Sequence, residues 1–326
     1  MKHTKSFLRD LFAIFLILSS SVSIAQDYPS QLIRIVVPYS PGGSTDNYAR
    51  LIASKLQTAW GKSVIVENRP GASGLIGSER VRKSPPDGYT LLFTSSSAQV
   101  LSPLLMKPRP FDAVADFTPI SKAVRFPLYL IVHPSIPVRS LREFVAFAKA
   151  RPGQLNYSSS GLGGTSHLVT ELFNSATGIK ASHLPYKGSA PALIAVITGE
   201  AQYLFNNIGV SQPLVAAGKL RGLAITGDKR SPALPKIPTF GEVGVRGLED
   251  AYTWLGMLAP AKLPAAITNK LSAEVIRIMQ SPEVEKRVLN DGYMLVANTP
   301  EQFSREIQAD VGIWSRVIRE NGIKAR

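Results

Sequence analysis

A glycine-rich turn between a strand-like segment and an amphipathic helix is the feature that most constrains this chain. Residues 32–37 are mostly apolar, and residues 38–46 read Pro-Tyr-Ser-Pro-Gly-Gly-Ser-Thr-Asp. Apolar residues then recur at helical spacing over residues 48–60. The pattern predicts a helix whose first N–H groups and positive dipole end lie beside the glycines. Such a turn binds an anion, typically a carboxylate or phosphate, or is a plain N-cap formed by Ser44 or Asp46.

Three further small-residue turns stand where a strand-like run passes into a helical run. They cover residues 94–98, 158–167 and 186–190. In open α/β sheets such turns gather at the carboxyl ends of the strands, where ligands bind. Two of the four turns lie in the first third of the chain and two in the middle. If these belong to different domains, the ligand lies in the cleft between them.

The first 25 residues have the pattern of a secretory signal peptide. A basic start is followed by an apolar stretch over residues 11–18 and by Ser23-Ile24-Ala25, a small-x-small cleavage pattern. The apolar stretch is too short to span a bilayer as a helix. We therefore expect an exported, periplasmic protein. The chain has no cysteine, so neither disulfides nor an N-terminal lipid anchor are expected.

The chain carries a net charge of +14, and a charge of this size can indicate a protein that binds nucleic acid. Its basic clusters are short, as at residues 80–83, and lack interleaved aromatic residues. We expect no nucleic-acid partner. The charge instead provides a scattered positive field that favours anionic solutes, or it serves solubility alone.

Strand-like and helical runs alternate along the chain, which predicts a parallel α/β architecture, and the length suggests roughly two domains. The candidate strands are residues 33–38, 63–66, 90–94, 129–132, 155–157, 220–226 and 254–259. The candidate helices are residues 44–60, 74–83, 140–150, 165–177, 189–198, 211–217, 265–279, 282–290 and 300–320.

The four turns offer hydroxyl and amide groups but little charge, since Lys187 is their only cation. Several oriented N–H groups can replace the water shell of a carboxylate, and Tyr39 could lie against an apolar ligand body or pack within its loop. The motifs G-x-S-x-G and H-E-x-x-H are absent. No histidine has a partner at metal-ligand spacing, and His167 suits packing or capping better than ligand contact. We expect no catalytic residue, no metal and no cofactor.

In order and spacing, these residues resemble the periplasmic receptors of tripartite tricarboxylate transporters, also called the Bug receptor family. The resemblance runs from about Tyr28 to the C-terminus. It implies a two-domain, type II periplasmic-binding-protein fold with a closing cleft, and delivery of a small carboxylated solute to the permease subunits of such a transporter. The motifs that carry it are residues 41–46, 66–72, 86–92, 160–168, 185–188 and 259–260.

The resemblance also implies where the ligand binds. The first Gly-Gly turn and neighbouring backbone typically hold the ligand carboxylate, which places Tyr39, Gly43, Ser44 and Asp46 in one shell. Ser160, Gly164, Thr165 and His167 belong to the facing shell. Close backbone approach is expected at Gly43, and a positive φ there would be a second reason for glycine. The full set of candidate ligand-binding residues is Tyr39, Gly43, Ser44, Thr45, Asp46, Ser95, Ser96, Ser160, Gly164, Thr165, His167, Lys187, Gly188 and Asn206.

Two departures from the family pattern are present. Gln202 replaces a usual aspartate, which puts any ligand contact at that position in doubt, and residues 260–264 read Pro-Ala-Lys-Leu-Pro in place of Pro-x-Gly-Thr-Pro.

The extended runs 126–132 and 252–259 bracket the middle of the chain. We therefore predict one domain from residues 26–125 with 254–326, a second from residues 126–253, and a monomer. An exported enzyme using the same pocket, and a ligand-sensing protein that signals to a membrane sensor partner, remain alternatives.

Overall fold

The computed structural model describes residues 28–249, 251–320 and 323. The expected signal peptide, residues 1–25, lies outside the described residues. The described residues from Gln31 onward belong to one unit, which contains all the elements below. Among the described residues, no helix combines the length and apolar character that crossing a bilayer requires.

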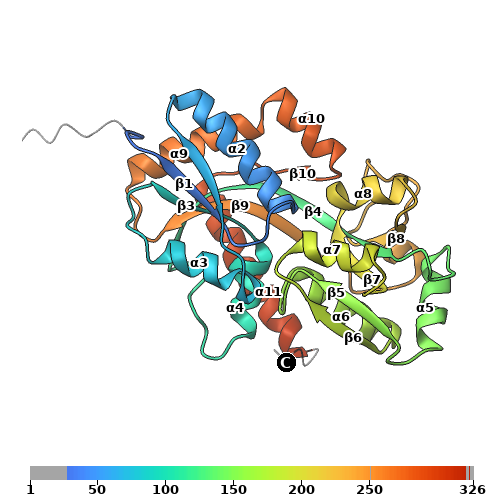
Figure 1. The fold of residues 1–326 in the computed structure, drawn as a ribbon. Helices are drawn as coiled ribbons and strands as arrows, with labels where there is room; N and C mark the ends of the chain where they lie inside the picture. The colour runs from blue at the N-terminus through green and yellow to red at the C-terminus, as the bar shows by residue number, and fades with distance from the viewer. Residues whose placement is uncertain (1–27, 250, 321–322, 324–326) are drawn as a thin grey trace, which may run out of the picture. The chain divides into compact units, whose positions relative to one another are not determined.

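The first β/α group contains three parallel strands in the order β2-β1-β3 (Figure 1). α2 buries Ala49, Ile52 and Leu56, which helical spacing places on one face. Gly61 follows its last residue, and φ of 60° there suits glycine. The elements of this group are β1 (Ile33–Val37), α2 (Ser44–Trp60), β2 (Val64–Asn68), η1 (Ala72–Gly74), α3 (Leu75–Arg82) and β3 (Thr90–Ser95).

The second β/α group repeats the arrangement, with parallel strands in the order β7-β5-β6. α7 contributes Leu193 and Val196 to a buried apolar cluster that also contains Ile131 and Leu204. The elements of this part are α5 (Leu141–Lys149), β5 (Leu155–Ser159), α6 (Thr165–Thr177), β6 (Ala181–Pro185), α7 (Ser189–Ile197), β7 (Tyr203–Asn207), α8 (Ile208–Ala216) and β8 (Arg221–Ile225).

Two long strands, β4 (Phe117–Val132) and β9 (Tyr252–Pro260), connect the two groups. They run antiparallel to each other, and β9 is also antiparallel to β3, as β4 is to β7 and β8. The sheet is therefore mixed, and the prediction of a parallel sheet is wrong for this part. The reason is topological: a chain that leaves one group and later returns must cross in opposite directions.

The remaining helices agree closely with the sequence prediction, and α8 begins three residues earlier than expected. A helical stretch after β3 was not predicted, because Ser95, Ser96 and Ser97 have the composition of a loop. The remaining elements are the π-helix η2 (Ser97–Leu101), α4 (Ser102–Leu105), η3 (Gly241–Val243), α9 (Ala265–Met279), α10 (Pro282–Asn290), β10 (Met294–Leu295) and α11 (Pro300–Glu320).

Candidate ligand-binding site

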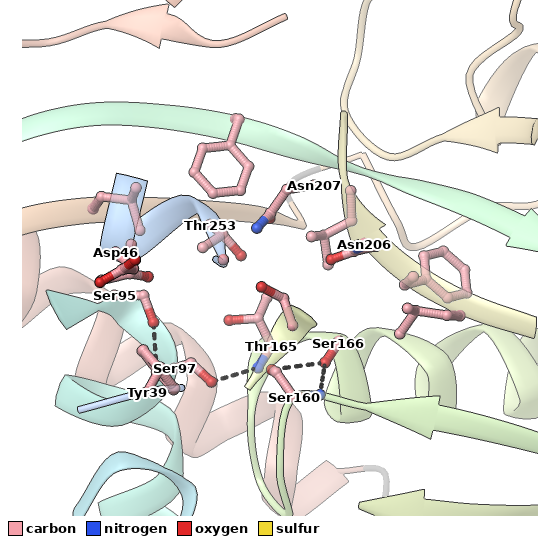
Figure 2. Close-up of a pocket in the computed structure, with 18 residues that line it drawn as sticks. Tyr39, Asp46, Ser95, Ser97, Ser160, Thr165, Ser166, Asn206, Asn207 and Thr253 are labelled. Carbon is pink, nitrogen blue, oxygen red and sulfur yellow. Dashed lines mark hydrogen bonds between the residues drawn. The ribbon is translucent and has the colours of Figure 1, made fainter. Parts of the chain in front are cut away.

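A pocket of about 530 Å³, including the solvent at its mouth, lies at the ends of β1, β3, β5 and β7 and against β4 and β9 (Figure 2). Among the residues that the structure describes, no lysine, arginine or histidine lines it. It is lined by Tyr39, Gly43, Thr45, Asp46, Ser95, Ser97, Phe126, Leu128, Ser160, Thr165, Ser166, Ser189, Leu204, Phe205, Asn206, Asn207, Thr253 and Leu255.

The strand order explains why polar residues from distant segments meet here. In the first β/α group the chain passes from β1 to β2 and then back across β1 to β3, so the winding reverses between β1 and β3. The second group reverses in the same way between β5 and β7. Loops diverge at such a switch point and leave a crevice at the carboxyl ends of the strands. Both crevices open onto this pocket.

Four α-helices begin at the pocket: α8, whose N-cap is Asn207, and α2, α6 and α7. The N-cap residues of the last three are Gly43, Gly164 and Gly188, and none of these provides a side-chain cap. The first-turn residues Thr45, Thr165 and Ser189 line the pocket. The starts of these helices supply backbone N–H groups and positive dipole ends, which favour an anion.

The glycine N-caps allow other segments to approach closely. A Cβ added at Gly43 would lie 2.6 Å from Ser189 Oγ, and one added at Gly164 would lie 2.6 Å from Ser97 Oγ. The backbone at Gly43 has φ of −82°, so the suggested positive φ is wrong for that residue; Gly42 has it instead, at 87°. The constraint at Gly43 is therefore the space beside Ser189 Oγ rather than the backbone conformation.

Asp46 fixes the first turn. Its carboxylate accepts hydrogen bonds from the backbone N–H of Gly42, from Arg50 Nε and from Asn68 Nδ2, at 2.9–3.0 Å. Burial raises the pKa of Asp46, but these donors, with Arg50 foremost, outweigh it and leave the pKa below its ordinary value. The negative charge is thus compensated within the turn, which reduces its repulsion of an anionic ligand.

Tyr39 connects the turn after β1 to the segment after β3. Its hydroxyl lies 2.7 Å from Ser95 Oγ and accepts from the backbone N–H of Ala98. Burial is the main reason that the pKa of Tyr39 is raised, so the hydroxyl stays protonated. Ser97 Oγ in turn accepts from the backbone N–H of Thr165 at 3.0 Å and caps α6 from a distant segment.

The predicted residues fall into two groups. Tyr39, Gly43, Thr45, Asp46, Ser95, Ser160, Thr165 and Asn206 line the pocket, whereas Ser44, Ser96, Gly164, His167, Lys187 and Gly188 are not among its lining residues. Ser44 Oγ contacts Tyr293 OH and accepts from Asn207 Nδ2. The Lys187 side chain is exposed, and its carbonyl accepts from the backbone N–H and the hydroxyl of Ser40.

His167 packs beneath the loop before α6. Its ring stacks on His183 with centroids 4.1 Å apart, and its Nδ1 accepts from the backbone N–H of Gly163 at 3.0 Å. Burial, and then the neighbouring His167, lower the pKa of His183 to about 3. The structure thus gives His167 the packing and capping role that its sequence position suggested.

Sequence reasoning missed some lining residues close to the predicted turns and others far from them. Ser97, Ser166 and Ser189 belong to the small-residue turns, so their signal was present. Phe126, Leu128, Thr253 and Leu255 lie within β4 and β9, where a pocket-facing residue has the same composition as a core residue. Asn207 had a weak signal, as one of two asparagines that end a buried apolar strand.

Comparison with known proteins relates the chain to one family of receptors. A sequence profile of the tripartite tricarboxylate transporter family receptor matches residues 48–323. Protein BugT of Bordetella pertussis is 36% identical over 303 residues, which cover 93% of each chain.

Two solved structures with bound solutes are similar throughout. The R. palustris protein Rpa4515, solved with adipate, has a TM-score of 0.88 and 36% identity, covering 91% of this chain and 99% of that one. MatC from Rhodopseudomonas palustris, with bound malate, has a TM-score of 0.85 and 28% identity, covering 89% of this chain and 100% of that one. The present chain has the two-domain α/β fold of periplasmic binding proteins, as predicted.

Proposed function

The chain belongs to the tripartite tricarboxylate transporter receptor family, and from this we propose that it captures a small carboxylate and delivers it to the permease of such a transporter. The family is one of periplasmic solute receptors rather than enzymes. We place this protein in the periplasm, exported by the signal peptide of residues 1–25, and acting as a monomer.

The observation that carries the proposal is the convergence of α2, α6 and α7 on a pocket without cationic side chains. A carboxylate in such a site exchanges its water shell for oriented N–H groups and hydroxyls, which suffices to hold one negative charge. The apolar lining from β4, β7 and β9 suits a carbon skeleton. The adipate and malate bound by two relatives support a carboxylate rather than a phosphate.

Titration calorimetry on the chain lacking residues 1–25 tests the proposal. The panel should contain mono- and dicarboxylates of two to eight carbons, with sugars and organic cations as controls. We expect one-to-one binding of a carboxylate at micromolar affinity or tighter, which corresponds to about 8 kcal/mol. Tight binding of only a sugar or a cation would contradict the proposal.

Delivery to a permease needs its own experiment. The genes of the membrane subunits should be co-expressed with this receptor, and uptake of the calorimetric ligand measured with and without it. We expect uptake to require the receptor. Ligand-dependent capture of a sensor kinase, with no effect on uptake, would instead favour the signalling alternative.

A further inference from the structure

Two polar side chains on the strands beside the pocket have no hydrogen-bond partner among the described residues. They are Thr253, through Oγ1, and Asn206, through Nδ2, and the residues are only 6% and 3% exposed. Both line the pocket, and Figure 2 shows them across it from Ser97 and Thr165. A buried polar group without a partner destabilises the fold, so its presence in a pocket indicates a partner that arrives with the ligand.

In the sheet, each of the two residues pairs with an aromatic residue of β4. Thr253 on β9 is directly opposite Phe126 of β4, and Asn206 on β7 is opposite Tyr129 of the same strand. β4 lies between β9 and β7 in the sheet, so the two polar atoms occupy separate points of the strand wall. Phe126, Leu128, Phe205 and Leu255 also line that wall. A carboxylate with a plain hydrocarbon tail would leave both polar atoms unpaired.

We infer that Thr253 and Asn206 are specificity-determining residues that hydrogen-bond to polar atoms of the solute other than the carboxylate held at the helix starts. The solute is then a carboxylate that carries a second hydrogen-bonding group, such as another carboxylate. This inference rests on the proposed function. Its physical basis is that a site built to hydrogen-bond a group discriminates strongly against the analogue that lacks the group.

Matched ligand pairs provide the test, because they differ only in the second group. The probes are succinate with butyrate, glutarate with pentanoate, and adipate with hexanoate. Calorimetry on the wild-type chain should favour the two-group member of at least one pair by about tenfold or more. Thr253→Val and Asn206→Leu should each reduce that preference by about fivefold or more, by weakening the two-group ligand alone.

Thr94→Val is the matched control. Thr94 is fully buried and also has an unpartnered hydroxyl, but it is not among the residues that line the pocket. Removing a buried unpaired hydroxyl should leave the melting temperature of the ligand-free protein unchanged or higher in both Thr94→Val and Thr253→Val. Only Thr253→Val should change the ligand preference, which separates recognition from a structural effect.

Different outcomes overturn different statements. If the wild-type chain binds both members of each pair equally, or if neither pocket variant changes the preference, the inference is wrong and the proposed function stands. If no carboxylate in the pairs or in the broader panel binds, the proposed function fails and the inference fails with it. Should Asn206→Leu lower the melting temperature, Thr253→Val alone decides.

Discussion

Gly43 and Ser189 illustrate how single residues create this site. A side chain at position 43 would meet Ser189 Oγ at the start of α7, so the serine hydroxyl would have to turn away. Lys187 lies beside the same region and is the one cation of the four turns, yet it is exposed and contributes a carbonyl to Ser40. Substitutions at Gly43 and Lys187 can therefore distinguish binding by helix dipoles from binding by a charged side chain.

Gly43→Val should weaken carboxylate binding at least tenfold, about 1.4 kcal/mol, because it fills space between two helix starts. The free energy of unfolding should change by no more than about 1 kcal/mol, since φ at Gly43 is negative. Lys187→Ala, the control, should weaken binding much less. Calorimetric affinities and melting curves measure both. If Lys187→Ala abolished binding and Gly43→Val did not, capture by helix starts would be disproved.

Asp46 gives a prediction for pH. Its pKa is lower in the folded protein than in the unfolded chain. The carboxylate therefore stabilises the fold above about pH 4, and this contribution is lost as pH falls through the folded-state pKa. Asp46→Asn should lower the free energy of unfolding by about 1–3 kcal/mol at pH 7. Denaturant titrations from pH 7 to pH 3 should show the difference from wild type shrinking; a constant difference would contradict this role.

At the scale of elements, the sequence predicts helices better than strands. The bounds of α2 and α6 were predicted because glycine turns precede them and a helix-ending glycine follows each one. β4 was predicted only in its last residues, because Pro119, Ser121 and Lys122 interrupt its apolar pattern. Those residues are tolerated where pairing with β9 shifts register. Propensity could not reveal this, since the partner strand is distant in sequence.

In the pocket, likewise, the residues of the turns could be predicted and the residues of the long strands could not. The small-residue composition of the turns after β1, β3 and β5 indicates their place in the sequence, so Gly43, Ser95 and Thr165 could be predicted. Thr253 could not, because its role depends on which residues of β4 and β7 the fold places beside it. Local chemistry thus predicts the helix starts that bind an anion, whereas the strand wall that completes the pocket is a product of topology.

The stacked histidines of α6 and β6, His167 and His183, should make stability depend on pH. The pKa of His183 is about 3 in the fold, below the ordinary value of 6.5. The unfolded chain therefore binds more protons than the folded protein below about pH 6.5, and stability falls as pH decreases. His183→Gln should make the decline of melting temperature between pH 7 and pH 5 shallower. An unchanged slope would show that this histidine pair does not control the response.

At the scale of the whole molecule, we predict that residues 26–125 with 254–326 move as one body and residues 126–253 as another. β4 and β9 are the strands that connect the two β/α groups, so a bend in them would open or close the pocket. Carboxylate binding should shorten distances between the bodies and leave distances within each body unchanged.

Spin labels can measure this motion directly, because the chain has no cysteine that would need removal. Lys62→Cys with Arg151→Cys places labels on the two bodies, and Lys62→Cys with Lys270→Cys keeps both labels on one; all three side chains are exposed. Ligand should shift the pulsed electron resonance distance only for the first pair. A shift in the second pair alone would refute the proposed boundaries.

Among the described residues, the pocket lining contains no lysine, arginine or histidine, so we expect the dissociation rate of the solute to depend little on ionic strength. Binding to backbone dipoles releases no counterions, and salt screens groups that are shielded from solvent only weakly. The positive net charge of the chain acts elsewhere: it attracts anions over the surface, and this attraction fades as salt rises. Dissociation should therefore proceed at the same rate in dilute and in brackish medium, while the rate of capture slows.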